Sequence, residues 1–434
     1  MYNYISIIIC SIFILYSIRY VKSVVNPLLV FSTLWGVILL LNSLNLFYLN
    51  TTEENIYFII FIGIISFGIG YIIVNIFKKR YSLSILKSNN KITLNKTYVP
   101  RYNLLCFMGI ICILYYLKDF NTVLKLLING NGLDAIRNMA QNPESIMNVR
   151  SSIENALRIL IIIPTSMALE PIAAIDLWIG RKHKPLIIIC ITIIILRVLS
   201  EGGRTPIVNF IFYIVVAYFI SKHSSEKKIV RALKRKKWYL IFVFILGCVI
   251  LWYSTLSRDR INTFKNIYYY FAMEPYMFNV WGNIAKDNNL IGYGLASFNG
   301  FIFPILYLIK NFFGIPFPEY WSNIYNLILQ TDSQWQIITI NGIRANAYVS
   351  TFWFFYLDGR MWGVVLGMLV YGMISAKTFI TAQRNPTCKN ICIYAIILQG
   401  ILYSFIRFSF SNIYYTLSIL FVVIVAYKSL NKEF

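Results

Sequence analysis

The chain has 434 residues, of which 58% are hydrophobic and only 13% are charged, and its mean hydropathy is +0.64. A soluble domain of this length cannot bury so much apolar surface, so the composition excludes a soluble protein and predicts an all-α polytopic membrane protein. The net charge of +23 is typical of nucleic-acid-binding proteins. The basic residues, however, are concentrated in short loops between apolar runs, which indicates membrane orientation and no nucleic-acid partner.

Apolar runs of membrane-spanning length recur along the chain. The first, at about 4–18, lacks a preceding basic segment and a small-residue cleavage site, which predicts an uncleaved membrane helix. The whole chain, 1–434, is expected to form a single integral membrane domain. The runs predict about 11 transmembrane helices, at 4–18, 27–49, 56–77, 102–118, 155–179, 185–200, 206–221, 238–254, 361–382, 391–406 and 409–427.

The basic clusters orient these helices. They follow the first, third, fifth, seventh and ninth helices and close the chain, so all fall on one side if the N-terminus is outside. Because basic loops stay in the cytoplasm, we expect the N-terminus outside and the C-terminus inside. The long stretch 255–358 then forms an extracytoplasmic cap. Its apolar pieces, 298–313 and 346–357, are interpreted as helices on the outer face; a further spanning pair would give 13 spans in the same orientation.

The turn between the sixth and seventh helices contains Glu201, Gly202, Gly203 and Arg204. Glycine permits a tight turn at positive φ, and Thr205 and Pro206 suit the cap and first position of the next helix. Arg204 then stands at a helix N-terminus, where N–H groups and the helix dipole favour an anion. The turn is interpreted as a phosphate site, and the alternative is a glycine turn with a snorkelling arginine.

Arginines gather on the outer side, against the positive-inside bias. An arginine beside the bilayer is unfavourable without a partner, and its planar guanidinium matches phosphate oxygens. The group predicts a diphosphate site at headgroup level; the alternative is snorkelling anchors or ion pairs, such as Arg158 with Glu154 one turn away. The outer arginines are Arg158, Arg197, Arg204, Arg258, Arg260, Arg344, Arg360 and Arg407.

A second turn places Asp358, Gly359 and Arg360 at the outer start of the helix at 361–382. Asp358 is expected to cap that helix; the alternative is a carboxylate that supports an arginine or accepts a proton. The other outer carboxylates suited to a general base are Glu201, Asp259 and Glu274, and the sequence does not choose among the four. No cluster of Asp, Glu and His has metal-ligand spacing, so a site without metal or cofactor is expected.

Two further groups of residues have both a functional and a structural interpretation. Glu170 lies near the middle of a predicted membrane helix, where it is either a functional carboxylate or a neutral structural one. An aromatic set in the outer region is suited to stacking on sugar rings or to an interfacial belt. Its members are Tyr268, Tyr269, Tyr270, Phe271, Tyr276, Trp281, Tyr320 and Trp321.

These features together resemble the Wzy-type O-antigen polymerases, the oligosaccharide repeat unit polymerases. The resemblance rests on the 202–204 turn between two mid-chain helices, on the long outer loop, and on the segment 346–363. That segment reads Asn346-Ala347-Tyr348, then Phe355 to Gly359, and Gly363. In the family the second turn usually reads Asp-Phe-Gly, whereas here Asp358 is followed directly by Gly359.

The resemblance implies a GT-C-like membrane fold and polymerisation of undecaprenyl-diphosphate-linked repeat units at the outer face of the bacterial inner membrane. The implied partners are the lipid-linked glycan donor and acceptor, membrane lipids and a chain-length regulator protein. The residues expected in catalysis are Arg204, Arg258, Arg260, Glu201 and Asp358. Those expected to bind substrate are Gly202, Gly203, Arg344, Arg360, Arg197, Tyr348 and Glu274.

Two other functions fit the same pattern less well. An O-antigen ligase uses the same lipid donor, but the family typically relies on a histidine in its outer loop, and both histidines here, His183 and His223, lie in basic loops. A lipid-linked oligosaccharide flippase is the non-enzymatic alternative. Transporters of that kind are expected to show repeated halves and midplane polar residues, whereas this chain has one large outer loop.

Overall fold

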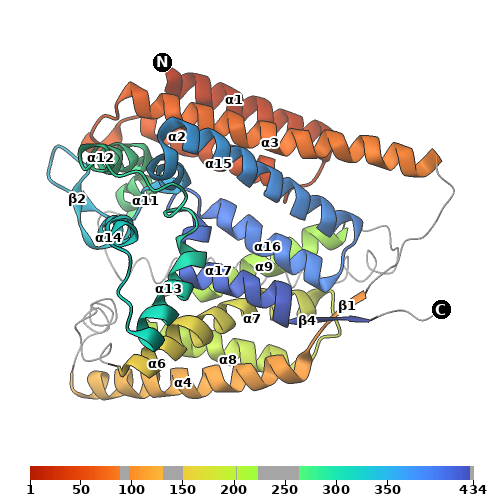
Figure 1. Cartoon of the computed structure of the whole chain (residues 1–434). Coiled ribbons are helices and arrows are strands. Elements are labelled where there is room, and N and C mark those ends of the chain that lie inside the picture. Colours follow the sequence, from red (N-terminus) through yellow and green to blue (C-terminus); the bar gives the residue numbers. More distant parts are fainter. Residues whose placement is uncertain (88–96, 131–149, 202, 223–262, 431–434) are drawn as a thin grey trace. The chain divides into compact units, whose positions relative to one another are not determined.

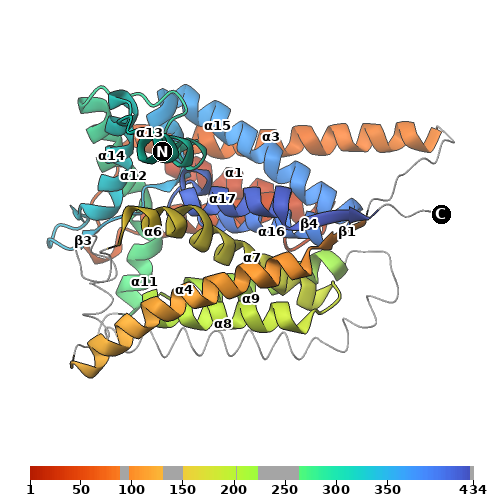
Figure 2. The ribbon, with the colours of Figure 1, turned by 60° about the horizontal axis from the view of Figure 1, so that its bottom comes forward.

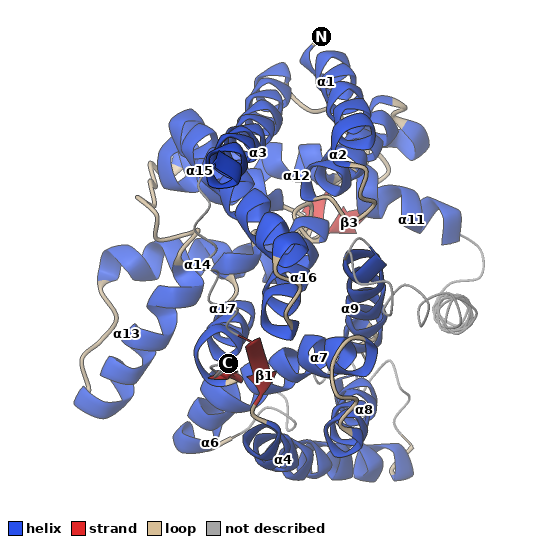
Figure 3. Cartoon of the chain, turned by 90° about the vertical axis from the view of Figure 1, so that its right-hand side faces the viewer, coloured by secondary structure: helices blue, strands red, loops and turns tan. Residues whose placement is uncertain are grey.

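The computed structural model describes residues 1–87, 97–130, 150–201, 203–222 and 263–430 (Figure 1). These residues are mostly helical, and the strands among them are short (Figure 3). They divide into two compact units, each assembled from separate stretches of the chain. The first unit comprises Met1–Leu94, Thr255–Thr381 and Ile397–Ile413, and the second comprises Asn95–Ser254, Ala382–Ile396 and Tyr414–Phe434.

The first unit begins with α1 (Tyr2–Tyr16), α2 (Pro27–Ser43) and α3 (Glu54–Lys87). α1 packs against both α2 and α3, and the three lie side by side in Figure 1. The start of α2 is set locally: the Asn26 side chain accepts a hydrogen bond from the Leu28 N–H at 3.1 Å, and Pro27 occupies the first helical position. The predicted helix 27–49 ends early, at Ser43, because left-handed Asn45 and Phe47 turn the chain.

The region expected as an outer cap is built mainly of helices. It contains α11 (Thr263–Ala272), α12 (Glu274–Asp287), α13 (Asn299–Phe313) and α14 (Glu319–Ser333). A small antiparallel hairpin of β2 (Gln336–Ile337) and β3 (Arg344–Ala345) follows. The two apolar pieces predicted to be helical, 298–313 and 346–357, are α13 and the start of α15 (Ser350–Arg384).

A sharp kink divides α15 at the predicted second turn. Gly359 has φ −163° and ψ 30°, and Arg360 has φ 51° and ψ −139°, so neither is helical. The helix expected at 361–382 therefore begins after this kink and runs to Arg384. An arginine at positive φ is sterically unfavourable, which indicates that contacts elsewhere hold the kink in place.

Aromatic side chains and glycines from distant segments form the core of the first unit. The rings of Phe31 and Phe67 stack with centroids 4.0 Å apart, and Trp35 meets Phe352 edge-on at 4.5 Å. The Trp35 indole N–H donates to Ser404 Oγ at 3.1 Å. α3 and α15 approach so closely that a Cβ added at Gly70 or Gly372 would clash with a backbone carbonyl of the other helix.

The second unit contains two short strands, β1 (Thr97–Pro100) and β4 (Tyr427–Leu430), and the helices α4 (Tyr102–Ile128), α6 (Ser152–Leu157), α7 (Ile163–Trp178), α8 (Lys184–Glu201), α9 (Thr205–Lys222) and α17 (Ile413–Leu420). The strands pair antiparallel, with Thr97 opposite Leu430. α4 runs beside α8 (Figure 2), and α7 contacts both α8 and α9. A further helix, α16 (Cys388–Leu402), contributes residues to both units. α4 extends ten residues past its predicted end because the segment after 118 is amphipathic and buries Val123.

Five helical segments in the described part of the chain are long and apolar enough to cross a membrane: Tyr2–Val21, Glu54–Phe77, Tyr102–Ile128, Ser152–Trp178 and Ser350–Arg384. Shorter apolar helices accompany them at Pro27–Ser43, Thr205–Ser221, Asn299–Phe313, Cys388–Leu402 and Ile413–Val425. The prediction of a largely helical membrane protein is confirmed to this extent. The count of eleven spans, the GT-C-like fold and the single domain stay predictions, and the helix predicted at 238–254 lies outside the described residues.

The contact between α3 and α15 generates a stability prediction. Gly372→Ala should lower the unfolding midpoint in detergent, because the new Cβ clashes with the Phe67 carbonyl, and overpacking costs about 1–3 kcal/mol. Gly36→Ala in α2 is the matched control, since its Cβ would meet only the Cys10 Cβ at 3.4 Å. Equal midpoints for the two variants, measured by thermal scans with size-exclusion detection, would contradict the close approach.

Candidate functional site

In the second unit, Arg197 is held between two carboxylates. Its Nη1 lies 2.6 Å from Glu170 Oε1, and its Nη2 lies 3.6 Å from Glu201 Oε2. The side chains of Arg197 and Glu170 are 10% and 2% exposed, whereas that of Glu201 is 34% exposed. Burial strengthens such contacts, and removing one partner would leave a buried charge uncompensated. Arg197, predicted to bind substrate, is therefore engaged with the protein, and the more exposed Glu201 remains accessible.

The glycine turn differs in detail from its prediction. α9 begins at Thr205, and the carbonyl of Arg204 accepts the first helical hydrogen bonds, from Ile207 N and Val208 N at 3.1 and 3.2 Å. Arg204, and not Thr205, therefore occupies the cap position, and its half-buried side chain starts from the helix N-terminus. Gly203 does not have a positive φ, and a Cβ there would meet no atom within 4 Å, so this glycine is not required sterically.

The ion pair between Arg158 and Glu154, considered as the alternative to a phosphate ligand, does not form. Glu154 Oε1 instead accepts from Lys118 Nζ at 2.6 Å and lies 3.8 Å from Arg150 Nε. Arg158 begins a π-helical turn, and its buried Nε has no hydrogen-bond partner in the structure. Lys118, which is distant in the sequence on α4, is thus the partner of Glu154 in place of Arg158.

In the first unit, Asp358 binds a distant loop and does not cap its own helix, so the predicted cap is wrong. Its Oδ1 and Oδ2 accept hydrogen bonds from the backbone N–H groups of Ala296 and Ser297, both at 2.9 Å. The backbone joins the same two segments, since Gly292 N donates to the Leu357 carbonyl at 2.7 Å. Asp358 is 7% exposed, so these charge-assisted bonds are shielded from water. The carboxylate thereby fixes the 292–297 loop before α13.

Arg360 binds the end of α12 from the kink of α15. Its Nη2 donates to the carbonyls of Ala285 and Leu290 at 3.1 and 2.7 Å, and its guanidinium lies 5.2 Å from the centre of the Tyr356 ring. A cation suits these carbonyls because the C-terminus of a helix carries partial negative charge. The buried Nη1 of Arg360 has no hydrogen-bond partner within the described residues. Asp358 and Arg360 thus fasten both ends of the loop between α12 and α13.

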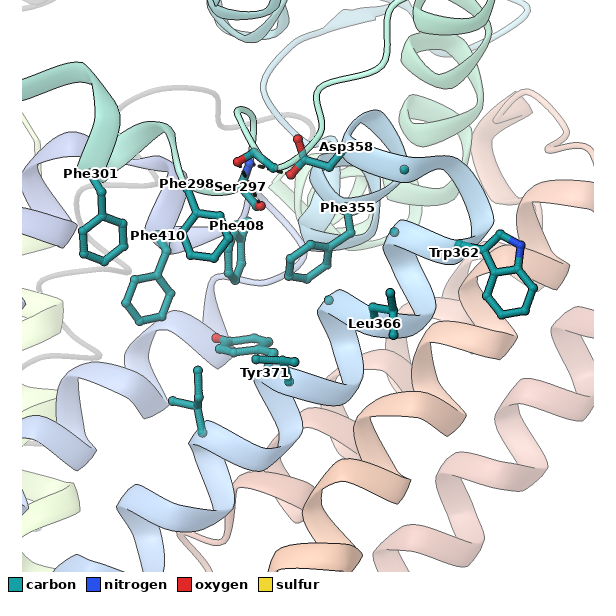
Figure 4. Close-up of a pocket in the computed structure, with 16 residues that line it drawn as sticks. Ser297, Phe298, Phe301, Phe355, Asp358, Trp362, Leu366, Tyr371, Phe408 and Phe410 are labelled. Carbon is teal, nitrogen blue, oxygen red and sulfur yellow. Dashed lines mark hydrogen bonds between the residues drawn. The ribbon is translucent and has the colours of Figure 1, made fainter. Parts of the chain in front are cut away.

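An apolar cavity of about 550 Å³ begins beside Asp358 (Figure 4). α15 forms one wall, and α13 with the 408–410 segment forms the other. Asp358 and Ser297 are at one end in Figure 4, and the rest of the lining is apolar or aromatic. This volume lies within the range of about 300–1,000 Å³ typical of small-molecule sites. Its lining residues include Phe298, Phe301, Phe355, Leu366, Val370, Tyr371, Ile374, Phe408 and Phe410.

The cavity is open along one side of α15. Trp362, Leu366 and Val370, spaced one turn apart, line it and are nevertheless 68%, 62% and 49% exposed. Gly363 and Gly367 leave room for the part of α15 that precedes the kink, because a Cβ at either position would clash with Phe355. An apolar chain could therefore enter from the side of a helix that is long and apolar enough to span a membrane.

The Asn346-Ala347-Tyr348 segment forms a strained link into α15. Ala347 and Ser350 have φ of 71° and 64°, which non-glycine residues rarely adopt. The Ala347 N–H donates to the Thr331 carbonyl at 2.7 Å, and the Ser350 N–H donates to the Ile406 carbonyl at 3.2 Å. Tyr348 is half-buried and packs on Tyr270 and Phe405, while Arg344 on β3 is exposed. Of these predicted binding residues, only Arg344 projects freely to the surface.

Glu274 is completely buried at the start of α12. Neither carboxyl oxygen has a hydrogen-bond partner in the described structure, and the nearby Ser350 hydroxyl is likewise unpaired. Burial raises the pKa of the Glu274 carboxyl from its usual 4.5 to about 8, and the Ser350 hydroxyl offsets only part of that rise. The group is therefore a neutral acid at neutral pH. It lines no part of the described cavity, and its contact with substrate stays a prediction.

Half of the aromatic set considered for sugar stacking or an interfacial belt belongs to the core. Trp281, Trp321 and Tyr268 are at most 3% exposed. Tyr270 and Tyr320, in contrast, are 51% and 47% exposed. Local sequence did not separate the two classes, because the exposure of each ring depends on the helix packed over it.

The predicted site residues fall into two groups. Arg197, Glu201, Gly203 and Arg204 belong to the second unit, and Glu274, Arg344, Tyr348, Asp358 and Arg360 belong to the first. Gly202, Arg258 and Arg260 lie outside the described residues. Within the described ranges, no three His, Cys, Asp or Glu residues are grouped so as to hold a metal ion.

The cavity was not predicted from the sequence. Its only local signal is the spacing of Gly359, Gly363 and Gly367, one turn apart along α15. The opposing phenylalanines come from segments about 50–60 residues away on either side, and no periodic pattern links them.

No protein-family model matches the chain, and neither the curated proteins nor the solved structures compared with it yield a significant match.

Glu274 generates a prediction about pH. The folded state keeps a proton that the unfolded state releases above pH 4.5, so stability should fall as pH rises from about 4.5 to about 8 and then level off. The slope is at most about 1.4 kcal/mol per pH unit. Glu274→Gln should flatten this part of the curve, whereas Glu319→Gln, on the exposed first turn of α14, should not. Denaturant titrations at several pH values measure the free energy of unfolding. If its slope against pH is unchanged in Glu274→Gln, Glu274 is not the group responsible for the pH dependence.

Proposed function

We propose that the chain is a membrane glycosyltransferase of the Wzy type, which polymerises undecaprenyl-diphosphate-linked oligosaccharide repeat units. The reaction takes place at the outer face of the bacterial inner membrane, with the N-terminus outside and the C-terminus in the cytoplasm. The observation that carries the proposal is the laterally open apolar cavity that ends at Asp358. It fits a substrate with a long hydrocarbon chain and a polar head.

The cavity supports a polyprenyl ligand on energetic grounds. A polyprenyl chain that leaves the bilayer exchanges one apolar surrounding for another, so the cavity would bind it through van der Waals packing against its lining. Among the side chains that line it, those with hydrogen-bonding groups are Ser297, Asp358, Trp362 and Tyr371, and the others are apolar. Asp358 already accepts two backbone hydrogen bonds, so its role is to shape the polar end of the cavity rather than to exchange protons.

The proposed reaction transfers the growing glycan to a hydroxyl of another lipid-linked unit. The acceptor oxygen bonds to the anomeric carbon, the bond from that carbon to the diphosphate oxygen breaks, and the diphosphate leaves with its bonding electrons. Guanidiniums at a helix N-terminus stabilise the developing charge, which is the role proposed for Arg204. Arg258, Arg260 and Arg344 are proposed as further phosphate ligands.

The hydroxyl proton requires a base. Of the outer carboxylates within the described residues, Glu274 is buried and Asp358 is committed to backbone N–H groups, whereas Glu201 is 34% exposed; Asp259 lies outside those residues. Glu201 is three residues from Arg204 in the chain, so both groups belong to one turn. We therefore assign the base role to Glu201.

Gene deletion in the source strain tests the proposed function. Loss of long glycans with retention of single capped units is the result expected for a polymerase. Absence of surface glycan would indicate a ligase, and accumulation of internal lipid intermediate would indicate a flippase; either result would reject the proposal.

Blocking the cavity should abolish polymerisation without unfolding the chain. Val370→Trp places a large ring in the cavity and should reduce long-chain glycan at least tenfold, because lost burial of about 1.4 kcal/mol already costs a factor of ten. Ile69→Trp on α3 is the matched control, since Ile69 is 44% exposed and does not line the cavity. Glycan ladders from complemented cells measure the effect, and a normal ladder with Val370→Trp would exclude the cavity as the lipid site.

Arg204→Ala should leave the protein in the membrane and abolish long chains, because a phosphate ligand that acts in the transition state contributes about 10²–10³-fold in rate. Arg204→Lys should retain part of the activity, as it keeps the charge and loses the planar fork. Arg19→Ala is the control, since Arg19 is exposed and is not among the predicted site residues. A normal ladder from well-expressed Arg204→Ala would remove this residue from the site.

A further inference from the structure

Two exposed tyrosines form a pair beside the cavity. Tyr293 and Tyr320 are 77% and 47% exposed, and their rings lie nearly parallel, with centroids 6.5 Å and planes 25° apart. Tyr293 is on the loop between α12 and α13, and Tyr320 is in the first turn of α14. Both rings therefore present aromatic surface to solvent.

This surface is rigid. The Tyr293 N–H donates to the Asp358 carbonyl at 2.9 Å, and the Tyr320 hydroxyl donates to the Ile291 carbonyl. Tyr293 has φ 49°, a conformation unfavourable for a residue with a Cβ. The loop is thus held in a strained shape that directs a bulky aromatic residue outward, although glycine would adopt it without strain.

The same loop forms the rim of the cavity. Gly294, the residue after Tyr293, lines the cavity, as do Ser297 and Phe298 (Figure 4). The Asp358 carboxylate, at the polar end of the cavity, binds the same loop three and four residues after Tyr293, at Ala296 and Ser297. The 293–298 segment therefore carries one tyrosine of the pair and also forms the polar end of the apolar cavity.

We propose that Tyr293 and Tyr320 form a carbohydrate-binding platform that holds a sugar of the glycan whose lipid chain occupies the cavity. This inference rests on the proposed function and assigns its sugar contacts. The negative face of an aromatic ring attracts the polarised C–H groups of a pyranose, and the phenol oxygens at its edge hydrogen-bond to hydroxyls. Tyrosine loses little conformational entropy on binding, and a ring fixed in advance loses less.

An interfacial aromatic belt is the other common use of exposed tyrosines. A belt requires only that a ring reach the headgroup region, which an unstrained loop or helix end achieves. It requires neither a left-handed backbone at Tyr293 nor the parallel alignment with Tyr320. The carbohydrate platform accounts for both features.

Binding of a lipid-free glycan tests the platform directly. The probe is the reducing oligosaccharide released by mild acid from the lipid-linked repeat units of the source strain. It is added to the full-length protein in nanodiscs and observed by saturation-transfer NMR. The wild-type protein should bind it, and Tyr293→Gly should weaken binding at least fivefold. Glycine suits the positive φ, so this variant removes the ring while relaxing the backbone.

Companion variants separate the ring from the fold. Tyr320→Ala should weaken binding similarly, Tyr293→Trp should retain it, and Tyr4→Ala on α1, where Tyr4 is 63% exposed, should leave it unchanged. If both Tyr293→Gly and Tyr320→Ala bind the glycan as tightly as the wild type, the platform is overturned. If these variants also leave the membrane fraction, the tyrosines belong to an interfacial belt. If binding depends on the tyrosines but gene deletion leaves glycan chains normal, the polymerase function is rejected. The carbohydrate-binding platform is then still supported.

Discussion

The organisation of the first unit depends on the bond between the Asp358 carboxylate and the N–H groups of Ala296 and Ser297. A charge with 7% exposure is tolerated there because each oxygen accepts a backbone hydrogen bond at 2.9 Å. This contact sets the polar end of the cavity, the position of the α13 entry and the shape of the loop that carries Tyr293. Without it, three features of the proposed site would lose their common support.

Strain accumulates around this contact. Ala347, Ser350 and Arg360 all have positive φ within 14 residues of α15 and its approach, and Tyr293 has positive φ on the loop that Asp358 holds. Each such residue costs on the order of 1–3 kcal/mol and persists only where other contacts over-determine it. The Arg360 bonds to Ala285 and Leu290, and the backbone bonds of Ala347 and Ser350, supply those contacts. Strain concentrated at one place is typical of a functional site.

The arginines predicted on the outer side have different contacts in the structure. Arg197 lies between Glu170 and Glu201, and Arg360 binds helix-end carbonyls, so both stabilise the protein. Arg407 pairs with Asp332, next to the strained link into α15. Arg204 and Arg344 differ, since one occupies a helix cap position and the other an exposed strand. The structural roles of Arg197, Arg360 and Arg407 leave fewer arginines as candidates for the proposed diphosphate site.

The sequence by itself determined the features that depend on local composition. Apolar length predicted the helices, and the Asp-Gly-Arg turn at 358–360 predicted where α15 breaks, because hydrophobic burial and backbone sterics act over a few residues. Only the tertiary structure decided the partners: Asp358 reaches Ala296 across 62 positions, and Arg197 reaches Glu170 across 27. It also decided which tyrosines are exposed and where the cavity lies. Such contacts depend on which helices pack together, and helices with similar apolar faces give no local signal of their neighbours.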